Sequence, residues 1–414
     1  MDSPVNNSGR DYSIMKKICF VTGTRADYGI MAPVMREVAQ SPLAQLQIIA
    51  TNMHLSPIYG STISEIEADG FKVDVAIDSL VPGGSAKATV ESMAKVENGL
   101  AEAFKSLNPD LVVILGDRYE ALAAAAAAVV FNIPVAHLHG GETSEGAIDD
   151  KFRHAITKLS TYHFAATPQY ADRIISMGEN PEHVFHSGAP GAECLQLSPV
   201  NSVTSQAPVG LMPVDDLSRE QEQKDAKDFF DKTGIYPGQP FILLAFHPVT
   251  TLDDKGIFEL QQTIKALDVF IIQGYSILLT MPNSDPGTES ISRTLLDWAE
   301  KNKGSVVAVK SLGARLFHYA LDNAMAIVGN SSAALIEAPS HRLGAVNVGM
   351  RQKGRAHGIT VVDAAPDKDS IATALNSVLS FEMKALLLGM PVSALNPYYK
   401  ENASKFIAEK LMEL

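Results

Sequence analysis

The chain carries a group of residues capable of proton transfer close to the ends of two predicted strands. They are Asp117, Arg118, His139, Glu142 and Asp149. Carboxylates and histidines can act as general acids and bases, and an arginine can hold a neighbouring carboxylate in its ionised form. Mutual repulsion between clustered carboxylates also pushes their pKa values apart, as a paired acid and base require. These residue types therefore predict proton-transfer chemistry.

Two apolar runs position this group. Residues 111–115 form a short β-branched run that ends in glycine, which is typical of a buried parallel strand. Residues 135–139 form the next predicted strand, with His137 and His139 on one face by the period-two rule. The alanine-rich segment 121–131 between them is predicted as the crossover helix, since small residues allow close packing on a sheet. Open α/β sheets bind ligands at the carboxyl ends of their strands, so we expect one shared crevice.

Two further loops are suited to binding an anion. Strand 17–22 leads through a glycine-bearing turn with Arg25 into a helix, where backbone amides and the helix dipole favour negative charge. The spacing is not that of a Walker or dinucleotide motif, and a purely structural turn explains it equally well. His247 follows strand 241–246 in a polar loop at the same predicted edge of a sheet. These loops predict contacts with a phosphorylated ligand.

A pair of serines opens another predicted helix. Ser331 and Ser332 follow a predicted strand and precede the helix 333–338. Hydroxyl donors, free amides and the positive end of a helix dipole would together favour a diphosphate. Serine is also among the commonest N-cap residues, so simple capping is the alternative. Glu337 lies nearly two helical turns further on, near where a sugar hydroxyl could be bound.

Length and composition limit the class of protein. The chain has 414 residues, 46% of them hydrophobic and 20% charged, which suits a globular protein with two domains. A net charge of -13 and scattered basic residues argue against a nucleic-acid partner. No apolar run approaches the roughly 20 residues that span a bilayer, and no signal pattern opens the chain, so we expect a cytoplasmic protein without a membrane partner. Cys19 and Cys194 fit no metal or disulfide spacing, and we expect no metal and no cofactor.

The alternation of strand and helix patterns predicts two domains. It runs through residues 16–195 and resumes in a second α/β series over residues 217–390. The mixed composition of residues 196–216 interrupts it, which predicts an interdomain linker. Residues 1–15 lack periodicity, so we expect a disordered tail. The helical pattern within residues 391–414 could pack on its own domain or cross back to the first one.

Six motifs occur in order over about residues 16–380. They are GTRADYG at 23–29, GDRYEA at 116–121, HLHGGE at 137–142, IDDKFRHAITKLS at 148–160, FHPVTT at 246–251 and GNSSAALIEAP at 329–339. In this order they resemble the hydrolysing UDP-N-acetylglucosamine 2-epimerases. The resemblance implies an α/β, GT-B-like fold, with two Rossmann-like domains whose parallel sheets face each other across a cleft. It also implies conversion of UDP-N-acetylglucosamine and water to N-acetylmannosamine and UDP, at the start of sialic acid synthesis.

The resemblance implies roles in binding the nucleotide. By position, Ser331 and Ser332 would hold the diphosphate, and Glu337 would hold the ribose hydroxyls. Arg25 and His247 would face the phosphates. Arg118 could hold one of the acidic side chains ionised. A UDP-sugar is therefore the expected partner, and we also expect a homo-oligomer, either a dimer or a tetramer.

The resemblance also implies roles in proton transfer. These would fall to Asp117, to Asp149 and to a carboxylate after the HLH strand. Some family members have a glutamate where this chain has His139. Either His139 replaces that carboxylate or Glu142, three positions on, takes part.

The substrate's own chemistry fixes the order of steps. The C2 proton of such a sugar has no adjacent carbonyl, so a base cannot remove it first. Departure of UDP must lead, because the oxocarbenium character that develops at C1 acidifies C2. A base then leaves a 2-acetamidoglucal, and water adds back with inverted configuration at C2. This order requires cations and dipoles on the leaving diphosphate.

Other functions fit parts of the pattern. A sister group that the sequence resembles equally well acts on UDP-2,4-diacetamido-2,4,6-trideoxyglucose on the way to legionaminic acid. A GT-B glycosyltransferase would pass the sugar to an acceptor, and a non-hydrolysing epimerase would leave UDP attached. The alternative from another class is a non-catalytic nucleotide-sugar-binding protein, which would bind UDP without turnover.

Overall fold

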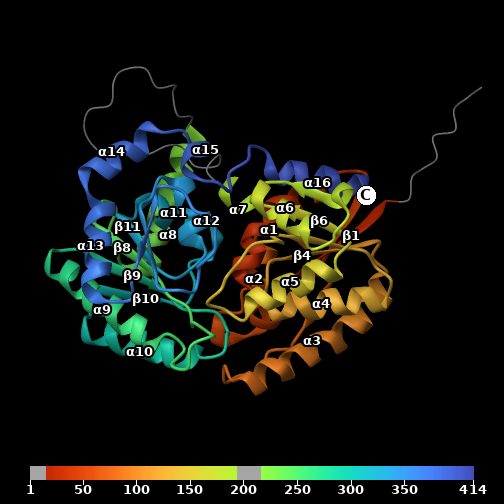
Figure 1. Ribbon diagram of the computed structural model, residues 1–414, viewed down its shortest axis with the longest axis horizontal. Coiled ribbons are helices and arrows are strands. Elements are labelled where there is room, and N and C mark those ends of the chain that lie inside the picture. The colour runs from red at the N-terminus through yellow and green to blue at the C-terminus, as the bar shows by residue number, and fades with distance from the viewer. Residues whose placement is uncertain (1–14, 194–215) are drawn as a thin grey trace, which may run out of the picture.

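Short apolar strands alternate with amphipathic helices along the chain and build two parallel sheets (Figure 1). The computed structural model describes residues 15–193 and 216–414. The expected tail and linker therefore lie outside the described residues, apart from Met15 and Asp216. The first sheet has seven strands in the order β3-β2-β1-β4-β5-β6-β7, and the second has six in the order β10-β9-β8-β11-β12-β13.

The first sheet and its helices come from the amino-terminal part of the chain. In order, its elements are β1 (Lys16–Thr22), α1 (Arg25–Gln40), β2 (Ala44–Thr51), η1 (Asn52–Leu55), η2 (Pro57–Tyr59), α2 (Ile63–Ala68), β3 (Val75–Ile77), α3 (Ala86–Leu107), β4 (Leu111–Leu115), α4 (Tyr119–Val130), β5 (Val135–Leu138), α5 (Asp149–Leu159), β6 (Tyr162–Ala165), α6 (Pro168–Ser176), η3 (Pro181–His183), β7 (Val184–His186) and α7 (Pro190–Glu193).

The second sheet comes from the carboxyl-terminal part. Its elements are α8 (Asp216–Thr233), β8 (Phe241–Ala245), α9 (Ile257–Ile272), β9 (Ser276–Thr280), α10 (Thr288–Lys301), β10 (Val306–Val309), α11 (Gly313–Asn323), β11 (Ala326–Gly329), α12 (Ala333–Ile336), η5 (Ala338–His341), β12 (Ala345–Val348), β13 (Val361–Ala364), α13 (Lys368–Leu379), α14 (Phe381–Gly389), α15 (Val392–Leu395) and α16 (Ala403–Glu413). The α/β, GT-B-like prediction is confirmed by this pair of parallel sheets and by the solved structures compared below.

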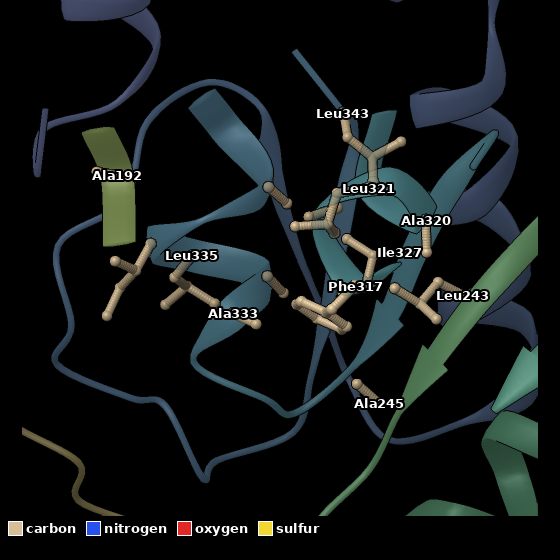
Figure 2. Packing of buried hydrophobic residues seen from close by; sticks show 14 of the residues in the cluster. Ala192, Leu243, Ala245, Phe317, Ala320, Leu321, Ile327, Ala333, Leu335 and Leu343 are labelled. Carbon is tan, nitrogen blue, oxygen red and sulfur yellow. The ribbon is translucent and has the colours of Figure 1, made fainter. Parts of the chain in front are cut away.

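Helices cover both faces of each sheet, which explains why most residues of the strands are apolar. In β1, Phe20 packs into the core on one face and Cys19 into the core on the other. Figure 2 shows the equivalent packing in the second half, where Leu243 and Ile327 of the sheet meet Phe317 of α11. Parallel sheets that are buried on both faces need such continuous apolar runs, because no strand face meets water.

The last helix lies against the first half of the chain. Helix α16 packs on α1, and Ile407 and Leu411 belong to the same hydrophobic core as β1 (Figure 1). Tyr398 and Tyr170 share a hydrogen bond of 2.9 Å between their hydroxyls on the way there. The chain therefore crosses back to the first half at its end, the second of the two possibilities that the helical pattern left open.

Two local predictions are wrong, for identifiable reasons. Strand β5 ends at Leu138, because His139 adopts a left-handed conformation with φ of 62°. The expected helix 333–338 is only the four-residue α12, followed by the 3-10 turn Ala338–His341. Pro339 lacks a backbone N–H and disfavours a helical residue before it, so the α-helix stops. A single turn has too small a dipole to be the main attraction for a diphosphate.

Apolar helices occur, but none of the described helices alone is long and apolar enough to cross a membrane. Helices α13 and α14 reach that length and composition only as a pair that is bent by 53°.

Candidate active site

A pocket with about 1310 Å³ of empty space, including its open mouth, lies between the two sheets. Loops at the carboxyl ends of strands from both sheets form its walls. The predicted site residues that line it are Arg25, Asp117, Arg118, Asp149, His247, Ser331, Ser332 and Glu337. His139 and Glu142 are not among its lining residues and are buried nearby. Tertiary folding thus joins side chains from distant parts of the chain.

Asp117 is held in place by a buried arginine from α5. The guanidinium of Arg153, which is 1% exposed, donates to the Asp117 carboxylate and also to the backbone oxygen of His139 at 2.8 Å. Strand β4 brings Asp117 to this point, and the neighbouring β5 and α5 supply its partners. The carboxylate therefore has a fixed position at the edge of the pocket.

Asp149 lies beside Asp117 in an electrostatically unusual place. Its side chain is 16% exposed, and the closest cation is Arg351 of the second half, at 3.9 Å. Burial, and then the negative charges of Asp117 and Asp285, raise the pKa of Asp149 to about 8. The pocket therefore contains a carboxyl group that keeps its proton near neutral pH.

Glu142 forms a fully buried ionic cluster outside the lining of the pocket. It accepts a hydrogen bond from Nδ1 of His139 at 2.6 Å and lies 2.9 Å from the guanidinium of Arg355. Burial alone would raise the pKa of Glu142, but Arg355 and His139 outweigh it and lower the pKa to about 2. Arg355 does line the pocket, so Glu142 acts on the pocket through this arginine.

We expect Glu142→Gln to lower the free energy of unfolding by about 3–5 kcal/mol, because the variant leaves buried cations without their counter-charge. Urea unfolding at pH 7 measures this loss. The wild-type contribution should be present above pH about 4, the ordinary glutamate range, and disappear as the pH falls towards the folded-state value. Glu145→Gln is the matched control, because Glu145 and its partner Lys353 are 49% and 54% exposed and such pairs contribute little. Equal losses in the two variants would contradict this interpretation.

An ion pair crosses the pocket between the halves. Arg118, after β4, donates to Asp285, after β9, at 2.9 Å, and also pairs with buried Glu120. Burial would raise the pKa of Asp285, but Arg118 and then Arg351 hold it below its ordinary value. Arg118 therefore holds Asp285 ionised, whereas burial outweighs Arg118 at Glu120 and raises the pKa of that carboxyl; neither is a carboxylate that the sequence predicted.

Three charged residues that the second half of the chain contributes to the pocket were not predicted from the sequence, namely Asp285, Arg351 and Arg355. Each follows a strand of the second sheet at its carboxyl end, β9 for Asp285 and β12 for the two arginines. The rule that selected Asp117 would have selected them too. Their loops match none of the six motifs, so the sequence did not single them out.

Arg25 and His247, for which the sequence predicted contacts with phosphates, both line the pocket. The backbone amides of Gly23 and Thr24 already donate to the carboxylate of Asp27, at 2.9 and 2.8 Å, so the turn before α1 is a capping structure. The Arg25 side chain remains as its cation, 5.6 Å from the centre of the Phe317 ring. Burial, and then the charge of Arg351, lower the pKa of His247 to about 3. His247 is thus neutral, and Arg351 supplies the positive charge there.

The serine loop keeps donors free. Among the described residues, the backbone N–H groups of Ser331 and Ser332 have no acceptor, and the Ser332 hydroxyl has no partner. Asn330 ties this loop to the neighbouring one, because its side chain pairs with the His247 backbone at 2.7 and 2.8 Å. The loop therefore presents several donors to one small volume.

The two halves touch around the pocket. The backbone N–H of Ile148 donates to the Thr250 hydroxyl at 2.9 Å, and the Thr251 hydroxyl donates to the oxygen of Gly146 at 2.9 Å. The loop that carries Asp149 is thus attached to the loop that follows β8. These two hydrogen bonds keep the two loops of the pocket wall in a defined position.

Comparisons with known proteins agree with this architecture. The family model described as UDP-N-acetylglucosamine 2-epimerase matches residues 36–412. A Legionella pneumophila protein named UDP-N,N'-diacetylbacillosamine 2-epimerase (hydrolyzing) is 38% identical over 89% of this chain and 90% of its own. An Escherichia coli protein named Polysialic acid biosynthesis protein P7 is 32% identical over 94% and 92%.

Solved structures support the fold. The UDP-GlcNAc 2-epimerase from Neisseria meningitidis, solved with bound UDP-GlcNAc, superimposes with a TM-score of 0.76 at 18% identity, covering 96% of this chain and all of that one (100%). The enzyme from Methanocaldococcus jannaschii gives a TM-score of 0.75 at 18% identity, with 96% and 100% covered. With a family match that runs through both sheets and the pocket between them, this chain belongs to the UDP-N-acetylglucosamine 2-epimerase family.

Proposed function

We propose that this protein is a hydrolysing UDP-sugar 2-epimerase that converts UDP-N-acetylglucosamine and water to N-acetylmannosamine and UDP. The observation that carries the proposal is the placement of Asp117 and Asp149 opposite a donor-rich loop of the other sheet, in one pocket. A sugar between the carboxylates would have its diphosphate among the cations and hydroxyls. Family membership and the names of the relatives support the same reaction.

The first step is loss of UDP. The C1–O bond to the diphosphate breaks, and the charge that develops on the leaving oxygen is stabilised by Arg25, Arg351 and the serine loop. Asp117 takes the C2 proton, which the cationic character at C1 has made acidic. The products of this step are UDP and 2-acetamidoglucal, with the proton on Asp117.

The second step is hydration of the glucal. Asp149, which holds its proton at neutral pH, delivers it to C2 from the face opposite to Asp117. Water adds to C1 as a hydroxyl group, and the proton that the water gives up returns to the protein. Inversion at C2 follows because one carboxyl removes the proton and another replaces it.

Turnover in deuterated water tests this scheme. We expect free UDP and an N-acetylmannosamine that carries deuterium at C2, measured by NMR, without any added acceptor. Inertness until an acceptor is supplied would indicate a glycosyltransferase, and an epimer still linked to UDP would indicate a non-hydrolysing enzyme. Binding of UDP with no product from any tested UDP-sugar would indicate a sensor. Product that carries only protium at C2 would argue against elimination and rehydration, provided that recapture by a shielded base is excluded.

A second substrate deserves a parallel assay. UDP-N,N'-diacetylbacillosamine is the same sugar nucleotide as UDP-2,4-diacetamido-2,4,6-trideoxyglucose, and the relative named for it is 38% identical to this chain. A Neisseria meningitidis relative named UDP-N-acetylglucosamine 2-epimerase is 31% identical. The same elimination and hydration would apply to either sugar, so comparison of kcat/KM for the two decides between them.

The pH dependence of kcat/KM should give the pKa of the general acid. We expect kcat/KM to fall about tenfold per pH unit above the pKa of Asp149, because only the protonated carboxyl can deliver a proton. The fall in kcat/KM should begin near pH 8, the value to which burial and Asp117 raise the pKa of Asp149. The profile of the free enzyme is read from kcat/KM between pH 5 and 10. If activity instead rises through pH 8, Asp149 would be the base and the two roles would be exchanged.

Ser332→Ala should weaken UDP binding. A hydroxyl that donates to a charged phosphate contributes about 1.5–3 kcal/mol, so we expect a Kd for UDP that is about 10- to 100-fold higher. Isothermal titration calorimetry measures it. Ser106→Ala, at an exposed position near the end of α3, is the control and should bind UDP like the wild type. An unchanged Kd for UDP in Ser332→Ala would show that the diphosphate does not bind at this loop.

A further inference from the structure

A chain of two histidines and an aspartate reaches the pocket from within the second half. His318 of α11 lines the pocket, and its Nδ1 lies 3.0 Å from Nε2 of His341. Nδ1 of His341 in turn lies 2.6 Å from Oδ1 of Asp322. The side chain of His341 is 1% exposed, so both of its nitrogens are committed within the protein. His318 keeps Nε2 as its remaining polar atom.

The order of donors along this chain determines what Nε2 can do. An ionised carboxylate only accepts, so His341 donates to Asp322 from Nδ1. A His341 ring that carries a single proton then accepts at Nε2, and the donor is Nδ1 of His318. Burial lowers the pKa of His318 to about 3, so this ring is neutral, and the proton on Nδ1 leaves Nε2 as an acceptor. No described residue hydrogen-bonds this atom.

A neutral acceptor, unlike the cations and hydroxyls of this pocket, does not suit a phosphate. Cations and donors such as Arg25, Arg351 and Ser332 match the many acceptors of a nucleoside diphosphate. The donors that a uridine diphosphate offers are few, namely the uracil N3–H and the ribose hydroxyls. A neutral acceptor on the wall can pair only with one of these.

We propose that His318 accepts a hydrogen bond from a donor of the uridine moiety, and that His341 and Asp322 are positioning residues that fix the tautomer able to do so. The inference rests on the proposed binding of a UDP-sugar. It adds a source of nucleotide selectivity. If the donor is the uracil N3–H, a cytidine nucleotide would place an acceptor against an acceptor and bind less tightly.

Binding of UDP analogues to the wild-type protein tests this. Calorimetric Kd values are compared for UDP, 3-methyluridine diphosphate, 2'-deoxy-UDP and 3'-deoxy-UDP. We expect one analogue to bind about tenfold more weakly than UDP, because it lacks the donor that pairs with His318. The analogue that loses affinity identifies the donor as N3–H or as one of the hydroxyls. Equal affinity for all four ligands would overturn the inference.

Two variants separate a specific contact from a structural role. His318→Phe should bind UDP about tenfold more weakly and should bind the weak analogue as well as UDP. His341→Phe should reduce the same discrimination, since the tautomer of His318 is no longer fixed. Tyr319→Phe, one residue along α11 and packed on Phe229, is the control and should discriminate like the wild type. Discrimination retained in His318→Phe would overturn the inference.

The failure of this inference can be told apart from failure of the proposed function. If the wild type does not bind UDP, the proposed function falls and this contact with it. If UDP binds and is released during turnover but the analogues bind equally, only the contact is wrong. The ¹⁵N chemical shifts of the His318 ring in the UDP complex give a direct check, because a protonated Nε2 that donates to the ligand would also overturn it.

Discussion

Replacing Asp149 by asparagine should lower kcat about 1,000-fold, within the range of roughly 10²–10⁴ that a positioned general acid contributes. Asparagine has the same shape but has no proton to deliver to C2. The change should leave the fold intact, because the carboxyl already keeps its proton near neutral pH and therefore carries little charge. Steady-state release of N-acetylmannosamine measures the effect.

Release of the 2-acetamidoglucal intermediate would distinguish loss of the acid from a general loss of activity. In Asp149→Asn, Asp117 can still remove the C2 proton, so UDP and 2-acetamidoglucal should be released while the hydrated product is lost. Asp172→Asn, at an exposed site on α6, is the matched control and should keep full activity. Wild-type turnover in Asp149→Asn would place the reaction elsewhere in the pocket.

Asp117→Asn should cause a loss of similar size, about 1,000-fold in kcat, because it removes the base of the first step. Here neither glucal nor N-acetylmannosamine should form, and UDP should stay attached to the sugar. Mass spectrometry of the reaction mixture distinguishes this outcome from the glucal that Asp149→Asn releases. Binding of UDP should be preserved, since the residues proposed to hold the diphosphate, namely Arg25, Arg351 and the serine loop, do not include Asp117.

A loss of structure could imitate this result, because Asp117 is the counter-charge of buried Arg153. The melting temperature of Asp117→Asn and its Kd for UDP exclude that explanation if both stay near the wild-type values. Accumulation of glucal by Asp117→Asn would contradict its assignment as the base. The same glucal pattern in both variants would mean that neither residue is confined to one step.

Much of the fold could be predicted from short apolar runs. The run 111–115 corresponds to β4 and most of the run 241–246 to β8, because a strand that is buried on both faces leaves an unbroken apolar signal. The rule that loops at the carboxyl ends of parallel strands meet also grouped Asp117 with Asp149 correctly in one pocket. The motifs indicated the family, and the family match covers nearly the same residues.

Other features depended on contacts that no local pattern encodes. His139 and Glu142 read as catalytic from sequence, yet Arg355, more than 200 positions away, draws Glu142 into a buried ion pair outside the pocket lining. We therefore propose that both are positioning residues, with Arg355 as the side chain that reaches the pocket. Because α12 has only four residues, the serine loop offers its own hydrogen-bond donors to a ligand and not the dipole of a long helix.

The sequence by itself determined which loops carry chemistry, the parallel sheets and the residue types available for proton transfer, because these follow from local apolar patterns and from turn residues. Only the tertiary structure decided which charges face each other. Asp149 keeps its proton because it is buried and because Asp117 and Asp285 come near it from two different sheets, and His247 stays neutral because burial and then the charge of Arg351 lower its pKa. A pKa depends on burial and on charges within a few ångströms, and those distances exist only after the two halves have packed together.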